Sequence, residues 1–285
     1  MSGALTIAAY ALRESTRRRV FVVVLILTVA FLALYAVGTE AAFDSIDAEA
    51  AGAVLDVDDQ VLTGSTLLGL AMFTTLFLGT VLAVFLTLGA VRGDAERGLL
   101  QPLLVRPVSR RTLLLGRYVA AATVCAAYVI AVFLATAVIT RVTGGWWPDR
   151  IVVPALGIAF AVAIIAALSL AGSVFLSATA NGIAVFMVFG AGLVAGLLGQ
   201  IGEALGSGTL ENVAKVSSWL LPFEGLYQAA LAGLTTDTVG FTKLAINLGP
   251  FGRAHAAGVA LWLWAVLYLA LVGAWALRGF ARRDL

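Results

Sequence analysis

Six long stretches almost free of charge constrain this chain more than any other feature. A helix needs about 20 apolar residues to cross the hydrocarbon core of a bilayer, which is roughly 30 Å thick. Arg117 is the only charged residue inside the six stretches, which cover 20–37, 62–91, 112–139, 151–177, 183–201 and 256–277. Only 12% of the whole chain is charged, whereas about a quarter of a soluble domain is. The sequence therefore predicts an all-α polytopic membrane protein with six transmembrane helices and a single transmembrane domain over 1–285.

The distribution of charge predicts how these helices are oriented. Cytoplasmic segments of membrane proteins are enriched in Lys and Arg. Placing the N-terminus, 92–117, 178–182 and the C-terminus on one side gives that side 13 of the 18 basic residues. The opposite side then holds 12 of the 16 acidic residues, seven of them in 38–60, which has no basic residue. We therefore expect both termini to be cytoplasmic and 38–60 to be a solvated acidic loop.

Two segments outside the spans have helical patterns of their own. Residues 5–19 are too short and polar to span a membrane, and fit either a helix lying in the cytoplasmic interface or a plain basic anchor. The external segment 202–255 predicts two short helices, from Thr209 to Leu220 and over 222–234, on the outer face or dipping in as a re-entrant hairpin. They could gate an exit path or merely cap the bundle. The remainder, 235–253, is expected to be a loop.

Several kinds of chemistry find no support in the sequence. The phosphate-binding pattern GxxxxGK[ST] needs a lysine, and the only lysines, Lys215 and Lys243, lie in NVAKVSS and GFTKLAI. One His and one Cys cannot build a soft-metal site, and neither GxSxG nor HExxH occurs. The spans lack interior ionisable residues, which disfavours a proton-coupled carrier. We expect no catalytic site, no metal, no resident cofactor and no nucleic-acid partner.

The connector between the second and third spans is more elaborate than orientation alone requires. RGDAERGLLQPLLVRPVSRRTLLLGRY, residues 92–118, holds six arginines, whose number the positive-inside rule explains. That rule does not explain the interleaved acids, the glycines or the two prolines. Pro107 would stop a short surface helix, because the residue before a proline avoids the α region, and Ser109 can cap the next helix. We expect a stiff charged knob that docks into a soluble partner and passes its motion to the adjoining spans.

At these residues the chain resembles the ABC-2 type permeases, the membrane subunits of ABC transporters, in the branch that includes the permease of the nitrous-oxide-reductase maturation transporter. LRESTRRRVFVVVLI is similar to the family's basic interfacial helix, and the connector is similar to its E-x-G-x-L…L…P-V-S-R…G-K pattern. Arg117 replaces the usual lysine, and Gly98 is followed directly by Leu99 instead of the threonine of the frequent G-T-L. SVFLSATANGIAVF resembles the turn between spans four and five, and LLPFEGLYQAA resembles the external segment before span six.

The resemblance implies a type V exporter-like transmembrane domain that works as a dimer in a prokaryotic plasma membrane. It implies that separate ATPase subunits, which carry ATP and Mg²⁺, dock on the connector 92–111 as a coupling helix. Most characterised members look like exporters. The coupling positions carried over from the family pattern are Glu96, Arg97, Gly98, Arg106, Pro107 and Arg110.

The residues themselves leave alternatives open. Uncharged polar residues cluster in the second span, and Thr74 and Thr75 are candidates for lining a substrate pathway. Threonines in membrane helices also serve helix packing or bond to the backbone. Without a pathway, the chain would be a membrane scaffold that anchors a soluble partner. The sequence fixes neither the substrate nor whether a dimer pairs identical chains.

Overall fold

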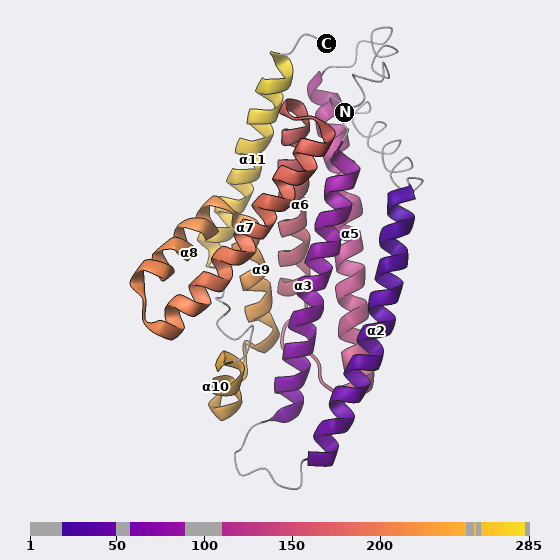
Figure 1. Ribbon diagram of the computed structural model, residues 1–285, viewed down its shortest axis with the longest axis vertical. Coiled ribbons are helices and arrows are strands. Elements are labelled where there is room, and N and C mark those ends of the chain that lie inside the picture. The colour runs from indigo at the N-terminus through magenta and orange to yellow at the C-terminus, as the bar shows by residue number, and fades with distance from the viewer. Residues whose placement is uncertain (1–18, 50–57, 89–109, 249–253, 255–257, 283–285) are drawn as a thin grey trace.

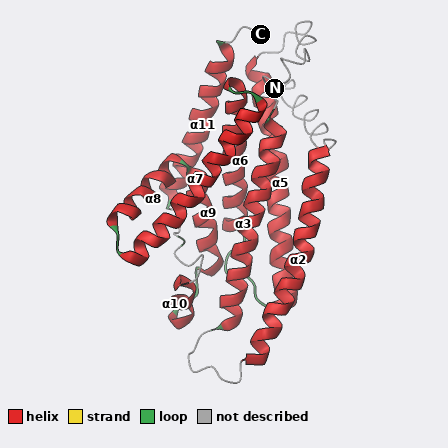
Figure 2. Ribbon diagram, in the orientation of Figure 1, coloured by secondary structure: helices red, strands yellow, loops and turns green. Residues whose placement is uncertain are grey.

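The computed structural model describes residues 19–49, 58–88, 110–248, 254 and 258–282, and this part of the chain contains helices and no strand (Figures 1 and 2). Six helices are long and apolar enough to cross a membrane, so the chain is an all-α multi-pass membrane protein. These are α2 (Arg19–Glu49), α3 (Asp59–Thr87), α5 (Arg110–Gly144), α6 (Val152–Phe175), α7 (Ala178–Leu205) and α11 (Val259–Ala281). The shorter elements are α8 (Gly208–Leu220), α9 (Pro222–Ala232), η3 (Gly233–Thr235) and α10 (Gly240–Leu248).

The core of the bundle is built around α6. This helix packs against α3, α5, α7, α9 and α11, and it and α3 are the most buried of the six spans. Fully buried side chains such as Met72, Phe133 and Ile158 meet there. The start of α2 and the end of α11 lie at the same end of the bundle (Figure 1), as an even number of spans requires. We call this the inner end, because the charge distribution predicts it to be cytoplasmic.

Buried hydroxyl pairs join α2 to α5. The Thr28 and Tyr128 hydroxyls lie 2.6 Å apart, and those of Tyr35 and Thr140 lie 2.7 Å apart. Each threonine hydroxyl also donates to a carbonyl one turn back, Thr28 to Val24 and Thr140 to Thr136. A hydroxyl has a single proton to donate, so the tyrosine is the donor within each pair. The interface thus leaves none of these four hydroxyls without a partner.

A polar contact of another kind ties α3, α6 and α7 at the inner end. Leu176 and Ser177 form the tight connection between α6 and α7. The Asn181 side-chain amide donates to the Ser169 carbonyl at 2.8 Å, and the Thr87 hydroxyl donates to the Ser169 hydroxyl at 2.6 Å. The turn that SVFLSATANGIAVF suggested is therefore held against α3, at the end from which the connector leaves.

Two segments expected to be loops contain helix. The first span was predicted to end at 37, yet α2 continues to Glu49, so the acidic segment 38–60 is helical in its first half. Phe43 lies in this extension of α2, where it is buried against Gly144 of α5. This contact stabilises the helix beyond the end of its apolar run. The segment 235–253 contains α10, where the Thr242 hydroxyl accepts a hydrogen bond from the Asp58 amide at 2.8 Å. Both helices depend on contacts across the bundle that local sequence does not reveal.

Candidate functional site

The segment between α7 and α11 turns back into the bundle. Gly206 adopts the left-handed backbone conformation that glycine favours and ends α7, after which α8 returns alongside α7 (Figure 1). Pro222 opens α9 directly after Leu221, and proline is well suited to a first helical turn because the amide it lacks has no partner there. The ranges of α8 and α9 lie close to the two short helices that the sequence suggested over 209–234.

The position of α9 beside α6 shows how far it reaches inward. Gly233, just after α9, lies against Pro154 in the first turn of α6, and Ala230 lies against Gly157 one turn further in. The two helices are therefore antiparallel. The eleven residues of α9, from Pro222 to Ala232, rise about 16 Å in a helix, which is about half of a bilayer core. Nine of the eleven residues of α9 are buried, so α9 belongs to the bundle and does not lie on its outer surface.

A row of glycines on α7 allows this close approach. A Cβ atom at Gly192 would meet the Phe223 ring, and one at Gly196 would meet the Glu224 carboxylate and the Gln228 amide. Further along, Gly199 and Gly202 face α8. The spacing of four, three and three residues keeps all four glycines on one face of the helix. Small residues of this kind let helix backbones approach in membranes, and here they bring the polar side chains of α9 against α7.

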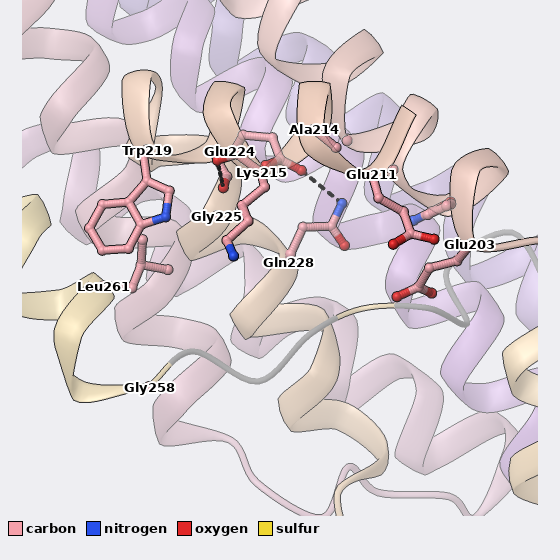
Figure 3. A pocket seen from close by; sticks show the side chains of 14 residues that line it. Glu203, Glu211, Ala214, Lys215, Trp219, Glu224, Gly225, Gln228, Gly258 and Leu261 are labelled. Carbon is pink, nitrogen blue, oxygen red and sulfur yellow. Dashed lines mark hydrogen bonds between the residues drawn. The ribbon is translucent and has the colours of Figure 1, made fainter. Parts of the chain in front are cut away.

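A cavity of about 500 Å³ lies between α7, α8, α9 and the start of α11. Figure 3 shows Glu224 and Gln228 at its centre, Lys215 and Trp219 on one side, and Glu203 and Glu211 on the other. Glu211, Lys215 and Trp219 are exposed, so the cavity opens along α8. The full lining is Gly196, Gly199, Gln200, Glu203, Glu211, Ala214, Lys215, Ser218, Trp219, Glu224, Gly225, Gln228, Gly258 and Leu261.

Glu224 is a carboxyl group buried inside the protein, with 4% of its surface exposed. Its Oε1 accepts a hydrogen bond from the Gln228 amide at 2.9 Å. Glu224 lies on α9, which is too short to span the membrane. Burial raises the pKa of Glu224 to about 7, and the hydrogen bond from Gln228 opposes part of this rise. This carboxyl group therefore changes charge near neutral pH, which is uncommon for a purely structural residue.

A second cavity of about 250 Å³ lies on the other side of the same residues, towards α3. Its lining is mostly apolar, and Leu70, Phe73 and Leu197 are exposed at its edge. Gln200, Glu224 and Gln228 line both cavities and separate them. Within the described part of the chain, the buried Tyr227 hydroxyl and the Gln228 Oε1 have no hydrogen-bond partner. The full lining is Leu70, Phe73, Leu193, Leu197, Gln200, Glu224, Tyr227, Gln228 and Leu231.

Comparison with known proteins identifies the family of this helical bundle. Residues 5–285 match the ABC-2 family transporter proteins. The chain belongs to this family. It matches no curated protein. ABC-2 permeases are membrane subunits of ABC transporters, typically without catalytic activity of their own, and they generally work with an ABC ATPase.

The structure reaches only part of the predicted site of this ABC-2 permease. Glu96, Arg97, Gly98, Arg106 and Pro107 lie outside the described residues, as do 5–18, and Arg110 is the first residue of α5. The assignment of these residues to coupling stays a prediction.

The two threonines predicted to line a pathway both bond to their own helix. The Thr75 hydroxyl is fully buried and donates to the Ala71 carbonyl at 2.7 Å. The Thr74 hydroxyl donates to the Leu70 carbonyl at 3.1 Å. Neither residue is part of the lining of the two cavities around Glu224, although Leu70 and Phe73 beside them line the smaller one. Their role in a pathway remains a prediction.

Sequence reasoning did not single out Glu224, Tyr227 or Gln228. The prediction of uncharged span interiors concerns the six spans, and α9 is not one of them. A signal was present, because Glu224 lies in the helical pattern formed by Phe223, Leu226 and Tyr227. A charged residue flanked by apolar positions of one short helix indicates a buried carboxyl group. Ionisable residues are indeed absent from the interior of the spans, but Glu224 lies on a short buried helix between two of them.

Proposed function

We propose that this chain is the permease subunit of an ATP-driven exporter, forms the translocation pathway as a dimer, and is powered by separate ATPase subunits. The family match over 5–285 carries the proposal. The sequence supports the need for a separate ATPase, because its two lysines lie in α8 and α10 and neither follows a phosphate-binding glycine loop. ATP and Mg²⁺ would then be bound by the partner and not by this chain.

The ATPase subunit would dock on the connector 92–111, with Glu96, Arg97, Gly98, Arg106, Pro107 and Arg110 as the coupling positions. The packing of the adjoining helices supports this role. The connector joins α3 to α5, which pack against each other and both pack against α6. A displacement of the connector would therefore move two neighbouring spans and the centre of the bundle together.

The apolar surface of α3 supports a second permease copy as a partner. This otherwise buried helix exposes Leu70, Phe73, Phe77 and Phe85, which lie close to one face at helical spacing. Near the inner end, α3 and α7 enclose a further apolar groove, whose lining includes Val84, Phe85 and Ile183. A dimer that joins these faces would enclose the pathway between its two copies. We place the protein in the plasma membrane of a prokaryotic cell, in the branch of the nitrous-oxide-reductase maturation permease.

Isolation of the tagged chain from its native membrane in mild detergent tests this function. We expect an ATP-binding soluble subunit at about one copy per permease, as the docking model requires. Changing Glu96→Gln together with Arg106→Gln should release it, whereas the matched pair Glu40→Gln with Arg282→Gln, which lies outside the connector, should retain it. Recovery of the permease alone, or with a partner that binds no nucleotide, would instead favour a scaffold.

A further inference from the structure

Two buried polar atoms close to Glu224 have no hydrogen-bond partner among the described residues. The Gln228 amide donates its hydrogen bond to the Glu224 carboxylate, and this orientation leaves Gln228 Oε1 as a buried acceptor without a donor. A buried polar atom without a partner is costly. Tyr227, which is 4% exposed, adds a hydroxyl without a partner to the lining of the smaller cavity. An acceptor pair that includes a carboxylate calls for a ligand that donates hydrogen bonds and carries positive charge.

The charges around the larger cavity favour the same sign of ligand. Among the described residues of the lining, Glu203 on α7, Glu211 on α8 and Glu224 on α9 outnumber the one basic residue, Lys215. At the start of α11, the lining residues Gly258 and Leu261 are uncharged. Trp219 also lines the cavity, and an aromatic ring attracts an ammonium group placed over its face.

The smaller cavity favours an apolar body on this ligand. Leu70 and Phe73 of α3, Leu193 and Leu197 of α7, and Leu231 of α9 surround it, and none of them offers a side-chain polar atom. The volumes of about 500 and 250 Å³ fall together within the range of small-molecule sites. Because Glu224 and Gln228 line both cavities, one molecule can place a charged head at these residues and an apolar chain towards α3.

We propose that the two cavities on either side of Glu224 form a binding site for an amphipathic organic amine, whose ammonium group donates hydrogen bonds to Glu224 and Gln228 and whose apolar chain occupies the cavity facing α3. As an assignment of substrate class, this inference rests on the proposed transport function. As a binding site, it can be tested without transport and without the ATPase.

Binding of labelled decylamine to the full chain in lipid nanodiscs tests the proposal, with empty nanodiscs correcting for partition into lipid. We expect saturable binding that unlabelled decylamine displaces and that neither decanol nor decanoate displaces. Glu224→Gln should weaken it by about tenfold or more, because it removes a charge-assisted bond to the ammonium group. Glu40→Gln, an exposed carboxylate on α2, should leave the affinity unchanged.

Two further variants keep the test decisive if Glu224→Gln alters the fold. Gly196→Val places a side chain against Glu224 and Gln228, whereas a Cβ atom added at Gly190 on the same helix meets no atom within 4 Å in the described chain, so Gly190→Val is the control. We expect the first variant to abolish saturable binding and the second to retain it. The proposal is overturned if decylamine shows no saturable binding, if Glu224→Gln or Gly196→Val binds it as tightly as the unmodified chain, or if decanoate displaces it equally well. Because no ATPase takes part, such a result leaves the proposed transport function standing, and only failure to recover an ATPase would remove that.

Discussion

Two helix interfaces of this protein bury polar side chains, and they do so in opposite ways. Between α2 and α5, tyrosine and threonine hydroxyls are paired, and each threonine also bonds to its own backbone. Between α7 and α9, the Tyr227 hydroxyl and Gln228 Oε1 have no partner among the described residues, and cavities adjoin them. Satisfied pairs hold two helices together, whereas unsatisfied atoms beside a cavity indicate where a ligand can bind. Burial of polar groups alone does not distinguish these two roles.

The largest effect that separates the two interfaces is the pH dependence of stability. Burial raises the pKa of Glu224 from 4.5 to about 7. The stability that the folded protein gains from the protonated Glu224 is therefore fully present below about pH 4.5 and is lost as the pH rises through 7. This difference corresponds to about 3 kcal/mol. We expect the midpoint temperature of thermal unfolding in detergent to decrease as the pH is raised from 5 to 8. Glu224→Gln should remove most of that decrease.

The other charged groups at the cavity provide the control for this measurement. Glu203, Glu211 and Lys215 line the cavity on α7 and α8, while α3 and α11 contribute only uncharged residues to the two linings. Glu211→Gln should therefore retain the fall in the unfolding midpoint. An equal loss of the pH dependence in both variants would assign it to the cavity's overall charge and not to Glu224.

The next effect concerns the α2–α5 pairs. Thr28→Val preserves the shape of the side chain but leaves the Tyr128 hydroxyl as a buried donor without an acceptor. We expect this change to lower the free energy of unfolding by about 1 kcal/mol, as for other buried hydrogen bonds in membrane proteins. The measurement is the denaturation midpoint in mixed detergent micelles. A midpoint equal to that of the unmodified chain would show that the Tyr128 hydroxyl finds another acceptor.

The smallest effect contrasts two tyrosines. Tyr128→Phe removes a donor whose acceptor, Thr28, remains bonded to its own backbone, so a loss of about 0.5 kcal/mol is expected. Tyr227→Phe removes a hydroxyl that has no partner among the described residues, so the ligand-free protein should be unchanged or slightly more stable in the same assay. If Tyr227→Phe proves the more costly of the two, then the Tyr227 hydroxyl is bonded in the protein and the contrast between the interfaces fails.

The spanning helices were predictable from sequence because a membrane span depends on the length and polarity of one continuous segment. The continuation of α2 to Glu49 was not, since it depends on Phe43 meeting Gly144 of a distant helix. Glu224 shows the same limit at the candidate site. The glycine row on α7 and the pattern of α9 are both visible in the sequence, but nothing local reveals that they face each other. The coupling positions of the connector, of which the structure describes Arg110 alone, depend on the family resemblance.

The most direct test of the central claim is whether a ligand at Glu224 stimulates ATP hydrolysis by the partner subunit. The permease and its ATPase subunit are reconstituted in nanodiscs, and ATP hydrolysis is measured as decylamine is added. We predict saturable stimulation in the unmodified complex and in Glu40→Gln, and at least a tenfold higher half-saturating concentration in Glu224→Gln. Equal stimulation of all three complexes, or none in the unmodified complex, would contradict the claim that this ABC-2 permease receives its substrate at Glu224.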